Sequence, residues 1–139
     1  MDEKDVADYI GNTFAGVETM TTLGYTFFFY GPDRMLPFAT IATADNEGDR
    51  VSNLDRPGVF RLNIGVTKPT FQSLFGPGKV DVGAYDFTAL DTIMPHPDYA
   101  PQSWLCVLNP SDTTFHKLQP LLSEAYELAV RRASRRKTS

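Results

Sequence analysis

The sequence predicts a single α+β domain in which an antiparallel β-sheet carries the N- and C-terminal helices on one face. Apolar residues recur at helical spacing near both ends of the chain. Several short segments between these ends have the composition of strands, and the links between them are short enough for hairpins. With 139 residues, of which 42% are apolar and 22% charged, the chain is long enough to form its own core.

The first half is expected to form a helix followed by strands. Residues 2–15 form the helix, because Val6, Ile10 and Phe14 follow one another at steps of four residues. Three segments then combine β-branched and aromatic residues, which favour strands. They are residues 17–22, 25–30 and 38–43.

Residues 25–30 (Tyr-Thr-Phe-Phe-Phe-Tyr) carry large apolar side chains on both faces of their strand. We therefore expect this strand to lie in the centre of the sheet, or one of its faces to line a groove. Gly-Pro-Asp at residues 31–33 predicts a turn before the next strand. Residues 44–55 are polar and are expected to form a solvated loop.

Residues 56–76 predict a turn, a strand and a short helix in succession. Pro57-Gly58 has the residues that a type II turn requires at its two central positions. Residues 60–66 alternate between apolar and polar or small side chains, which predicts a strand with its apolar side buried and its polar side out. The helix is expected to begin near Pro69 and to end at Gly76.

The second half is expected to contain two more helices and one strand. Residues 86–94 place apolar side chains on one side of a short helix, whereas the segment 95–101 has too many prolines for a helix interior. Residues 104–108 form an apolar strand. A long helix begins near Ser111, and Pro120 is expected to kink it or to mark where its regular part begins.

The net charge of −4 is unevenly distributed, because five of the last nine residues are basic. The rest of the chain is acidic, which argues against a nucleic-acid footprint over the whole domain. We expect a domain at residues 1–132 and a basic, frayed tail at residues 133–139.

The remaining composition bears on compartment and chemistry. Cys106 is the only cysteine and lies in an apolar run, so we expect a buried structural thiol. No apolar run approaches the length of a membrane span, and the acidic N-terminus is unlike a secretory signal. The sequence therefore predicts a cytoplasmic protein without a membrane partner.

The sequence contains no recognisable catalytic or metal-binding motif. His96 and His116 are the only histidines, and with a single cysteine they do not make a zinc site. The acidic residues Asp45, Glu47 and Asp49 lack the spacing of an EF-hand. We therefore expect no catalytic set, no metal and no other cofactor.

Three blocks of the chain resemble an uncharacterised bacterial domain family that has no assigned activity. They are residues 37–41 (PFATI), 55–66 (DRPGVFRLNIGV) and 104–111 (WLCVLNPS). The second half also resembles, more distantly, the MmcQ/YjbR family, through its Pro-His-Pro-Asp-Tyr loop, its Trp-led strand and its last helix. This resemblance implies a CyaY-like α+β fold. MmcQ/YjbR proteins are often described as DNA-binding, and the acidic charge of this chain departs from that description.

A candidate ligand-binding surface lies on the polar side of the strand at residues 60–66. Arg61 and Asn63 point away from its apolar side, toward the sheet face that the helices leave open. Thr40 on the neighbouring strand, and His96 and Tyr99 in the proline-rich loop, are expected close to them. Polar groups framed by aromatic residues are typical of a ligand pocket, although ordinary polar patterning on a solvated face remains the alternative.

These observations favour a non-enzymatic domain that binds an unknown small molecule or protein. One alternative is a nucleic-acid-binding protein that uses the basic tail, as the MmcQ/YjbR resemblance implies. Another is a small hydrolase or isomerase with His96 as its acid–base group and Arg61 stabilising an anion. The sequence does not indicate an oligomeric state.

Overall fold

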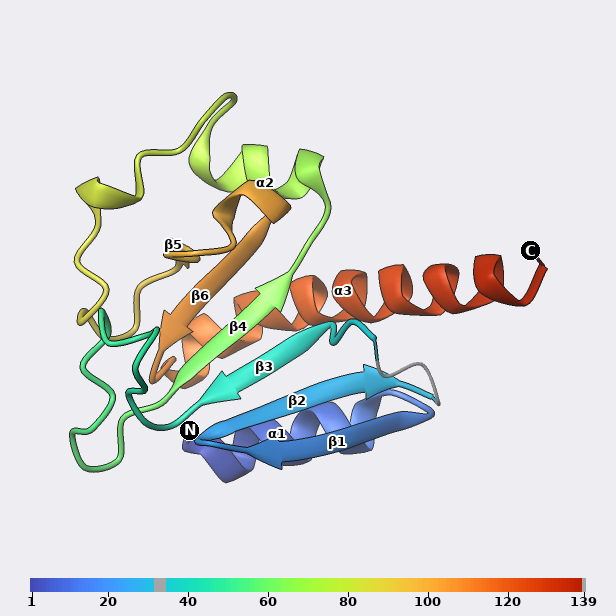
Figure 1. The fold of residues 1–139 in the computed structure, drawn as a ribbon, viewed down its shortest axis with the longest axis horizontal. Helices are drawn as coiled ribbons and strands as arrows, with labels where there is room; N and C mark the ends of the chain where they lie inside the picture. Colours follow the sequence, from blue (N-terminus) through green and yellow to red (C-terminus); the bar gives the residue numbers. More distant parts are fainter. Residues whose placement is uncertain (32–34, 139) are drawn as a thin grey trace.

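The computed structural model describes residues 1–31 and 35–138, which contain a six-stranded sheet and three α-helices (Figure 1). Neighbouring strands are antiparallel throughout, in the order β1-β2-β3-β4-β6-β5. The strands are β1 (Val17–Thr22), β2 (Tyr25–Tyr30), β3 (Ala39–Ala42), β4 (Arg61–Gly65), β5 (Met94–Pro95) and β6 (Trp104–Leu108). The helices are α1 (Glu3–Thr13), α2 (Lys68–Phe75) and α3 (Asp112–Thr138), with 3₁₀ turns η1 (Val82–Ala84) and η2 (Ala100–Gln102).

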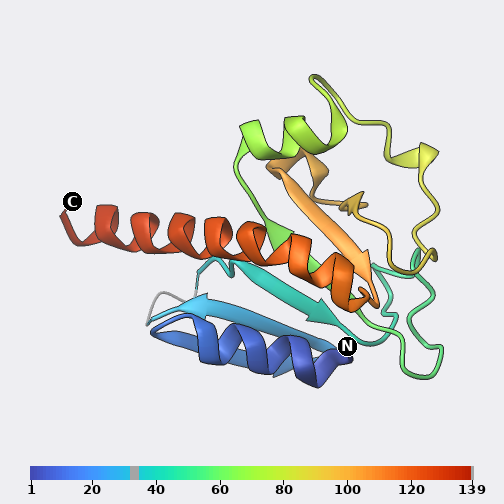
Figure 2. The same ribbon diagram turned by 180° about the vertical axis from the view of Figure 1, so that it is seen from behind.

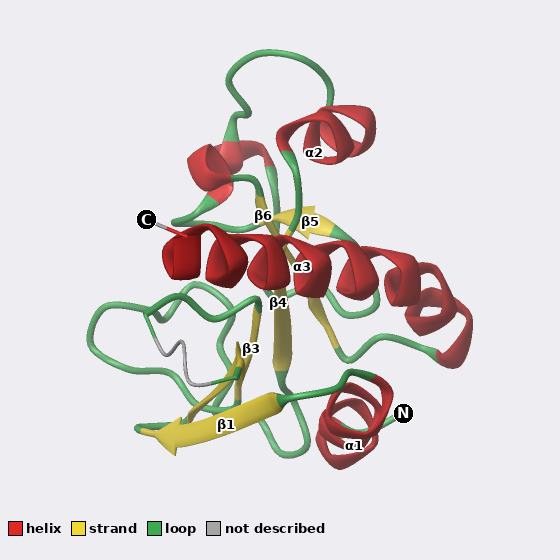
Figure 3. Ribbon diagram, turned by 90° about the vertical axis from the view of Figure 1, so that its right-hand side faces the viewer, coloured by secondary structure: helices red, strands yellow, loops and turns green. Residues whose placement is uncertain are grey.

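Helices α1 and α3 lie on the same face of the sheet (Figure 2). Their apolar residues, such as Ile10 and Leu118, pack in the main core with residues of the sheet, such as Ile41 and Leu62. Figure 3 shows α3 between α1 on one side and α2, near β6, on the other. The predicted α+β domain, with both terminal helices on one face of an antiparallel sheet, is therefore confirmed.

Local hydrogen bonds set the ends of the two shorter helices. The Asp2 carboxylate accepts from the backbone N–H of Asp5 (2.9 Å), and the Asp5 carboxylate accepts from the N–H of Asp2 (3.0 Å). This reciprocal pair is a capping box at the start of α1. The Thr67 hydroxyl caps α2, and Gly76 ends this helix at a φ of +91°, where glycine is favoured. The strand and helix predicted from residues 60–76 are both present.

Strand β4 is buried on both sides. Leu62 and Ile64 join the core beneath α1 and α3. Arg61 and Asn63 point to the opposite face of the sheet, which we call the second face, and they are only 0% and 1% exposed. The expectation that the polar side of this strand lies in solvent is therefore wrong, because other segments cover it.

A smaller apolar cluster lies on the second face near one end of the sheet. Its buried members are Ala42, Leu54, Phe87, Met94, Cys106 and Leu108. Leu54 comes from the segment 44–55, and Phe87 comes from the segment between α2 and β5. Both connections thus fold back over the sheet. Cys106 is fully buried in this cluster, as expected for a structural thiol.

Residues 86–94 do not form the predicted short helix. Phe87 and Met94 pack into the cluster on the second face, while Leu90 makes an isolated parallel bridge to Leu108 of β6. The apolar spacing that suggested a helix is therefore met by a non-helical segment that lies against the sheet and ends in β5, because tertiary packing outweighs weak local preference.

The segment 44–55 is a folded loop rather than a solvated one. The Asp45 carboxylate accepts from the N–H of Leu54 (2.8 Å), and the Asp55 carboxylate accepts from the N–H of Asp45 (3.1 Å). Ser52 and Leu54 are almost completely buried. These bonds hold the loop in a shape that returns its middle to the sheet.

The last helix starts at Asp112 and continues without interruption past Pro120 to Thr138. Pro120 therefore does not mark the start of its regular part. The end of α3 projects beyond the sheet (Figure 1), and the residues expected in a basic tail belong to its last turns as far as Thr138. Ser139 and most of the predicted turn at 31–33 lie outside the described residues. Within residues 1–31 and 35–138, no helix is long and apolar enough to cross a membrane.

Candidate functional site

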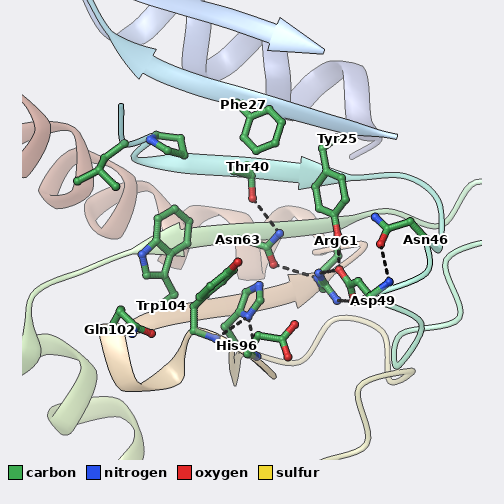
Figure 4. A pocket seen from close by; sticks show the side chains of 15 residues that line it. Tyr25, Phe27, Thr40, Asn46, Asp49, Arg61, Asn63, His96, Gln102 and Trp104 are labelled. Carbon is green, nitrogen blue, oxygen red and sulfur yellow. Dashed lines mark hydrogen bonds and ion pairs between the residues drawn. The ribbon is translucent and has the colours of Figure 1, made fainter. Parts of the chain in front are cut away.

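A pocket of about 660 Å³ opens on the second face of the sheet (Figure 4). Its floor is formed by β2, β3, β4 and β6, and its rim by the loop 44–55, the residues just before β3 and the segment after β5. It is lined by Tyr25, Phe27, Leu36, Pro37, Thr40, Asn46, Gly48, Asp49, Arg61, Asn63, His96, Asp98, Tyr99, Gln102 and Trp104. A volume of this size accommodates a small organic molecule.

Arg61 is the centre of a hydrogen-bond network beneath the pocket. Its Nη1 donates to Asp49 Oδ1 (3.1 Å) and to Ser52 Oγ (3.0 Å), and its Nη2 donates to Asp49 Oδ2 (2.5 Å). Its Nε donates to Asn63 Oδ1 (3.0 Å), and Asn63 Nδ2 donates in turn to Thr40 Oγ1 (2.9 Å). The guanidinium is thus held by a bidentate ion pair and by polar groups of two other segments.

The charge of Arg61 is neutralised locally by Asp49. Burial opposes ionisation of Asp49, but hydrogen bonds from Arg61 and from the Tyr25 hydroxyl outweigh it and lower the pKa of this carboxyl. Burial also disfavours the charged form of Arg61, and the bonds to Asp49 outweigh it and raise the pKa of the guanidinium. Both groups are therefore charged at neutral pH, and together they form a pair without net charge in the lining of the pocket.

His96 is held in one tautomer by the backbone that follows it. Its Nδ1 accepts hydrogen bonds from the N–H groups of Asp98 and Tyr99, both at 3.0 Å, so the ring proton lies on Nε2. Nε2 has no hydrogen-bond partner among the described residues, and it is not among the side-chain atoms that are buried without a partner. It points toward the side of the pocket where Asn63 and Arg61 lie (Figure 4).

Burial and the nearby Arg61 charge keep His96 neutral. Burial is the larger effect, and together they lower the pKa of the imidazole to about 3, although the Asp49 charge acts in the opposite direction. At neutral pH the pocket therefore contains an uncharged imidazole that offers an N–H donor and no lone pair.

Aromatic rings form much of the pocket wall. The rings of Tyr25 and Phe27, on alternate positions of β2, stack with their centroids 5.9 Å apart. Trp104 of β6 lies directly over Gly65 of β4, where an added Cβ would come within 2.7 Å of the indole. Tyr99 stands at the rim, with 55% of its surface exposed. The walls can therefore contact a flat apolar group on more than one side.

The five site residues expected from the sequence, Thr40, Arg61, Asn63, His96 and Tyr99, all line this pocket. The strand register places Thr40 directly opposite Asn63. Asp49 was not expected from the sequence as the partner of Arg61. A buried arginine needs a carboxylate partner, and the nearest acidic residues along the chain, in the loop 44–55, are the signal that could have indicated it.

Tyr25 and Phe27 of β2 line this pocket, in agreement with the alternative that one face of residues 25–30 lines a groove, whereas nothing in the sequence pointed to Trp104 as a wall. Within the described part of the chain, no three His, Cys, Asp or Glu side chains gather as metal ligands do. The geometry is suited to holding a molecule through apolar contacts and a few hydrogen-bond donors.

Comparison with known proteins gives a family and a fold. Residues 1–138 match the family described as "Family of unknown function (DUF6194)". A crystal structure of a protein from Pseudomonas syringae, a structural genomics target, is similar with a TM-score of 0.57 and 15% sequence identity. The similarity covers 93% of this chain and 99% of that one, and at this identity it shows the fold alone. No curated protein matches the chain.

Proposed function

Because this chain belongs to the Family of unknown function (DUF6194), we propose its function from the pocket alone: it binds a small, largely apolar molecule without transforming it. The observation that carries this proposal is the combination of aromatic walls with a polar floor in a pocket of about 660 Å³. Pockets for small molecules have this composition, in which apolar surface supplies affinity and a few polar groups fix orientation.

The state of His96 supports binding rather than acid–base catalysis. A general base needs a lone pair directed at the substrate, but Nδ1 is occupied by two backbone N–H groups. Arg61, the other residue of the hydrolase or isomerase alternative, is already paired with Asp49. These contacts give that alternative no specific support.

The other expectations from the sequence stay predictions. They are nucleic-acid binding through the basic end of α3, the similarity to MmcQ/YjbR and CyaY-like proteins, a protein partner and a cytoplasmic location. No feature of the described residues supports any of them as directly as the pocket supports ligand binding.

The test uses an uncharged fluorescent probe, N-phenyl-1-naphthylamine, titrated into the purified chain. Trp104 is the only tryptophan and lines the pocket, so binding there is expected to change its emission. We expect saturable binding of one probe per chain, with quenching of Trp104 in proportion to occupancy.

Two leucines provide a matched pair for this experiment. Leu36 lines the pocket and is 50% exposed, whereas Leu90 is 47% exposed and lies elsewhere. Leu36→Ala is expected to weaken binding about 3- to 10-fold, since it removes apolar contact worth roughly 1 kcal/mol, and Leu90→Ala is expected to leave it unchanged. Absence of saturable binding, or an equal effect of the two substitutions, would show that the pocket is not a binding site.

A further inference from the structure

The polar groups on the floor of the pocket limit the chemical class of ligand that can bind there, because each of them either donates or accepts hydrogen bonds. His96 can only donate toward the pocket, because its Nδ1 is held by the N–H groups of Asp98 and Tyr99. The Thr40 hydroxyl accepts from Asn63 Nδ2, so its own proton is left to donate. Asn63 Oδ1 is engaged by Arg61 Nε. The floor therefore presents donors to whatever lies above it.

The charge of the site argues against an anionic ligand. The guanidinium of Arg61 is completely buried and forms a bidentate pair with Asp49. The neutral state of His96 adds no positive charge. Asp98 brings a further carboxylate to the exposed rim. A carboxylate or phosphate would therefore lose its hydration without meeting an uncompensated cation.

The walls favour a flat group. The stacked rings of Tyr25 and Phe27 stand on one side of the floor, and Trp104 stands on β6, on the other side of β3 and β4 (Figure 4). The Tyr25 hydroxyl donates to Asp49, so this residue offers its ring rather than its polar end. Aromatic faces in this arrangement suit an aromatic or conjugated ring system.

We infer that the pocket takes an uncharged molecule with a flat apolar ring between these aromatic walls and a carbonyl-type oxygen that accepts a hydrogen bond from Nε2–H of His96. This inference rests on the proposed function, since it names the ligand class of the same pocket. His96 is then the residue that determines specificity, and its backbone contacts are what fix the direction of its N–H.

The experiment compares three probes of similar size: acetophenone, ethylbenzene and benzoate. Affinities are measured by displacement of N-phenyl-1-naphthylamine, and the His96 ring nitrogens are followed by ¹⁵N NMR. We expect acetophenone to bind about 5- to 10-fold more tightly than ethylbenzene, since one hydrogen bond to a buried donor has about that net value, and benzoate to bind most weakly. Acetophenone should shift the Nε2 resonance, and ethylbenzene should not.

His96→Asn distinguishes the role of Nδ1, which holds the loop, from that of Nε2, which faces the ligand. Its Oδ1 can accept the loop N–H groups in place of Nδ1, while the side chain is too short to replace Nε2. We expect this variant to lose the preference, so that the ratio of its affinities for acetophenone and ethylbenzene falls to about one. The wild-type Nε2 shift tests the same contact without any substitution.

The possible failures are distinguishable. Tight binding of benzoate, a preference for acetophenone that persists in His96→Asn, or an unmoved Nε2 resonance at saturation would overturn the ligand class while leaving the binding function intact. If N-phenyl-1-naphthylamine itself does not bind saturably, the proposed function fails as well.

Discussion

Arg61 connects the second face of the sheet to the loop that covers it. Its side chain has no exposed surface, and its hydrogen bonds join β4 to the loop that carries Asp49 and Ser52. A buried charge of this kind is tolerated only with its partner in place. The ion pair therefore fixes the loop over the sheet as much as it contributes to the pocket.

We predict that Asp49→Asn lowers the free energy of unfolding by about 3–5 kcal/mol, because Arg61 is left charged, buried and unpaired. Urea denaturation at pH 7 measures this loss. Asp55→Asn in the same loop is the control, since that carboxylate is exposed and accepts one hydrogen bond, and it should cost about 1 kcal/mol or less. Equal losses in the two variants would contradict the role given to the pair.

The sequence could identify the pocket residues on the strands but not all their partners. Arg61 and Asn63 are visible as polar residues within an apolar strand, and alternation gives the face to which they point. Asp49 is one of several acidic residues in a loop without regular structure, 12 positions before Arg61. No periodicity relates such a loop to a sheet, so this contact is determined by tertiary packing.

Strands β4 and β6 pack closely at one end, where Gly65 lies against the indole of Trp104. The antiparallel register places these residues opposite each other, and the indole occupies the space that a side chain at position 65 would fill. This contact sets the position of one pocket wall. It explains why a glycine with an ordinary backbone conformation lies at the end of this strand.

We predict that Gly65→Ala displaces Trp104, because the new Cβ would lie 2.7 Å from Cε2 and 2.9 Å from Nε1 of its indole. The substitution should cost roughly 1–3 kcal/mol of stability, weaken probe binding and change the Trp104 emission spectrum. Denaturation and the fluorescence titration measure these effects.

Gly11→Ala is the matched control, since nothing lies within 4 Å of the position of its Cβ on α1. It should stabilise the chain by up to about 1 kcal/mol and leave binding unchanged. Unaltered Trp104 emission in Gly65→Ala would show that the indole does not depend on this glycine.

Most helices and strands follow from the sequence, because their apolar periodicity agrees with the face they bury. The strand and helix within residues 60–76 are present as expected. The failure at residues 86–94 has a physical reason. Phe87 and Met94 have the spacing of a helix face, but Phe87 joins the cluster on the second face from a non-helical segment and Met94 joins it from the short strand β5. Local spacing does not distinguish between these two ways of burying the same side chains.

His96 makes the stability of the whole fold depend on pH, because it is buried in the lining of the pocket. Its pKa is lowered from 6.5 to about 3 by burial and by Arg61, with Asp49 acting in the opposite direction. Since the unfolded chain takes up a proton near pH 6.5 and the folded chain does not, this contribution is fully present above pH 6.5. It is lost progressively as the pH falls toward 3.

We predict that the wild-type chain loses about 2 kcal/mol more unfolding free energy than His96→Asn between pH 7 and pH 5. Urea denaturation of both proteins at the two pH values measures the difference, and it cancels the groups that the two proteins share. Parallel changes in the two proteins would mean that His96 titrates normally in the folded state.

The alternation of β4 has a consequence for how this protein can diversify. Leu62 and Ile64 belong to the layer beneath the helices, whereas Arg61 and Asn63 belong to the layer beneath the pocket. Rim residues such as Leu36 and Tyr99 contribute to neither buried layer and are at least half exposed. Substitutions at the rim would therefore leave both buried layers intact, so under the proposed function the choice of ligand can change at little cost to the stability of the fold.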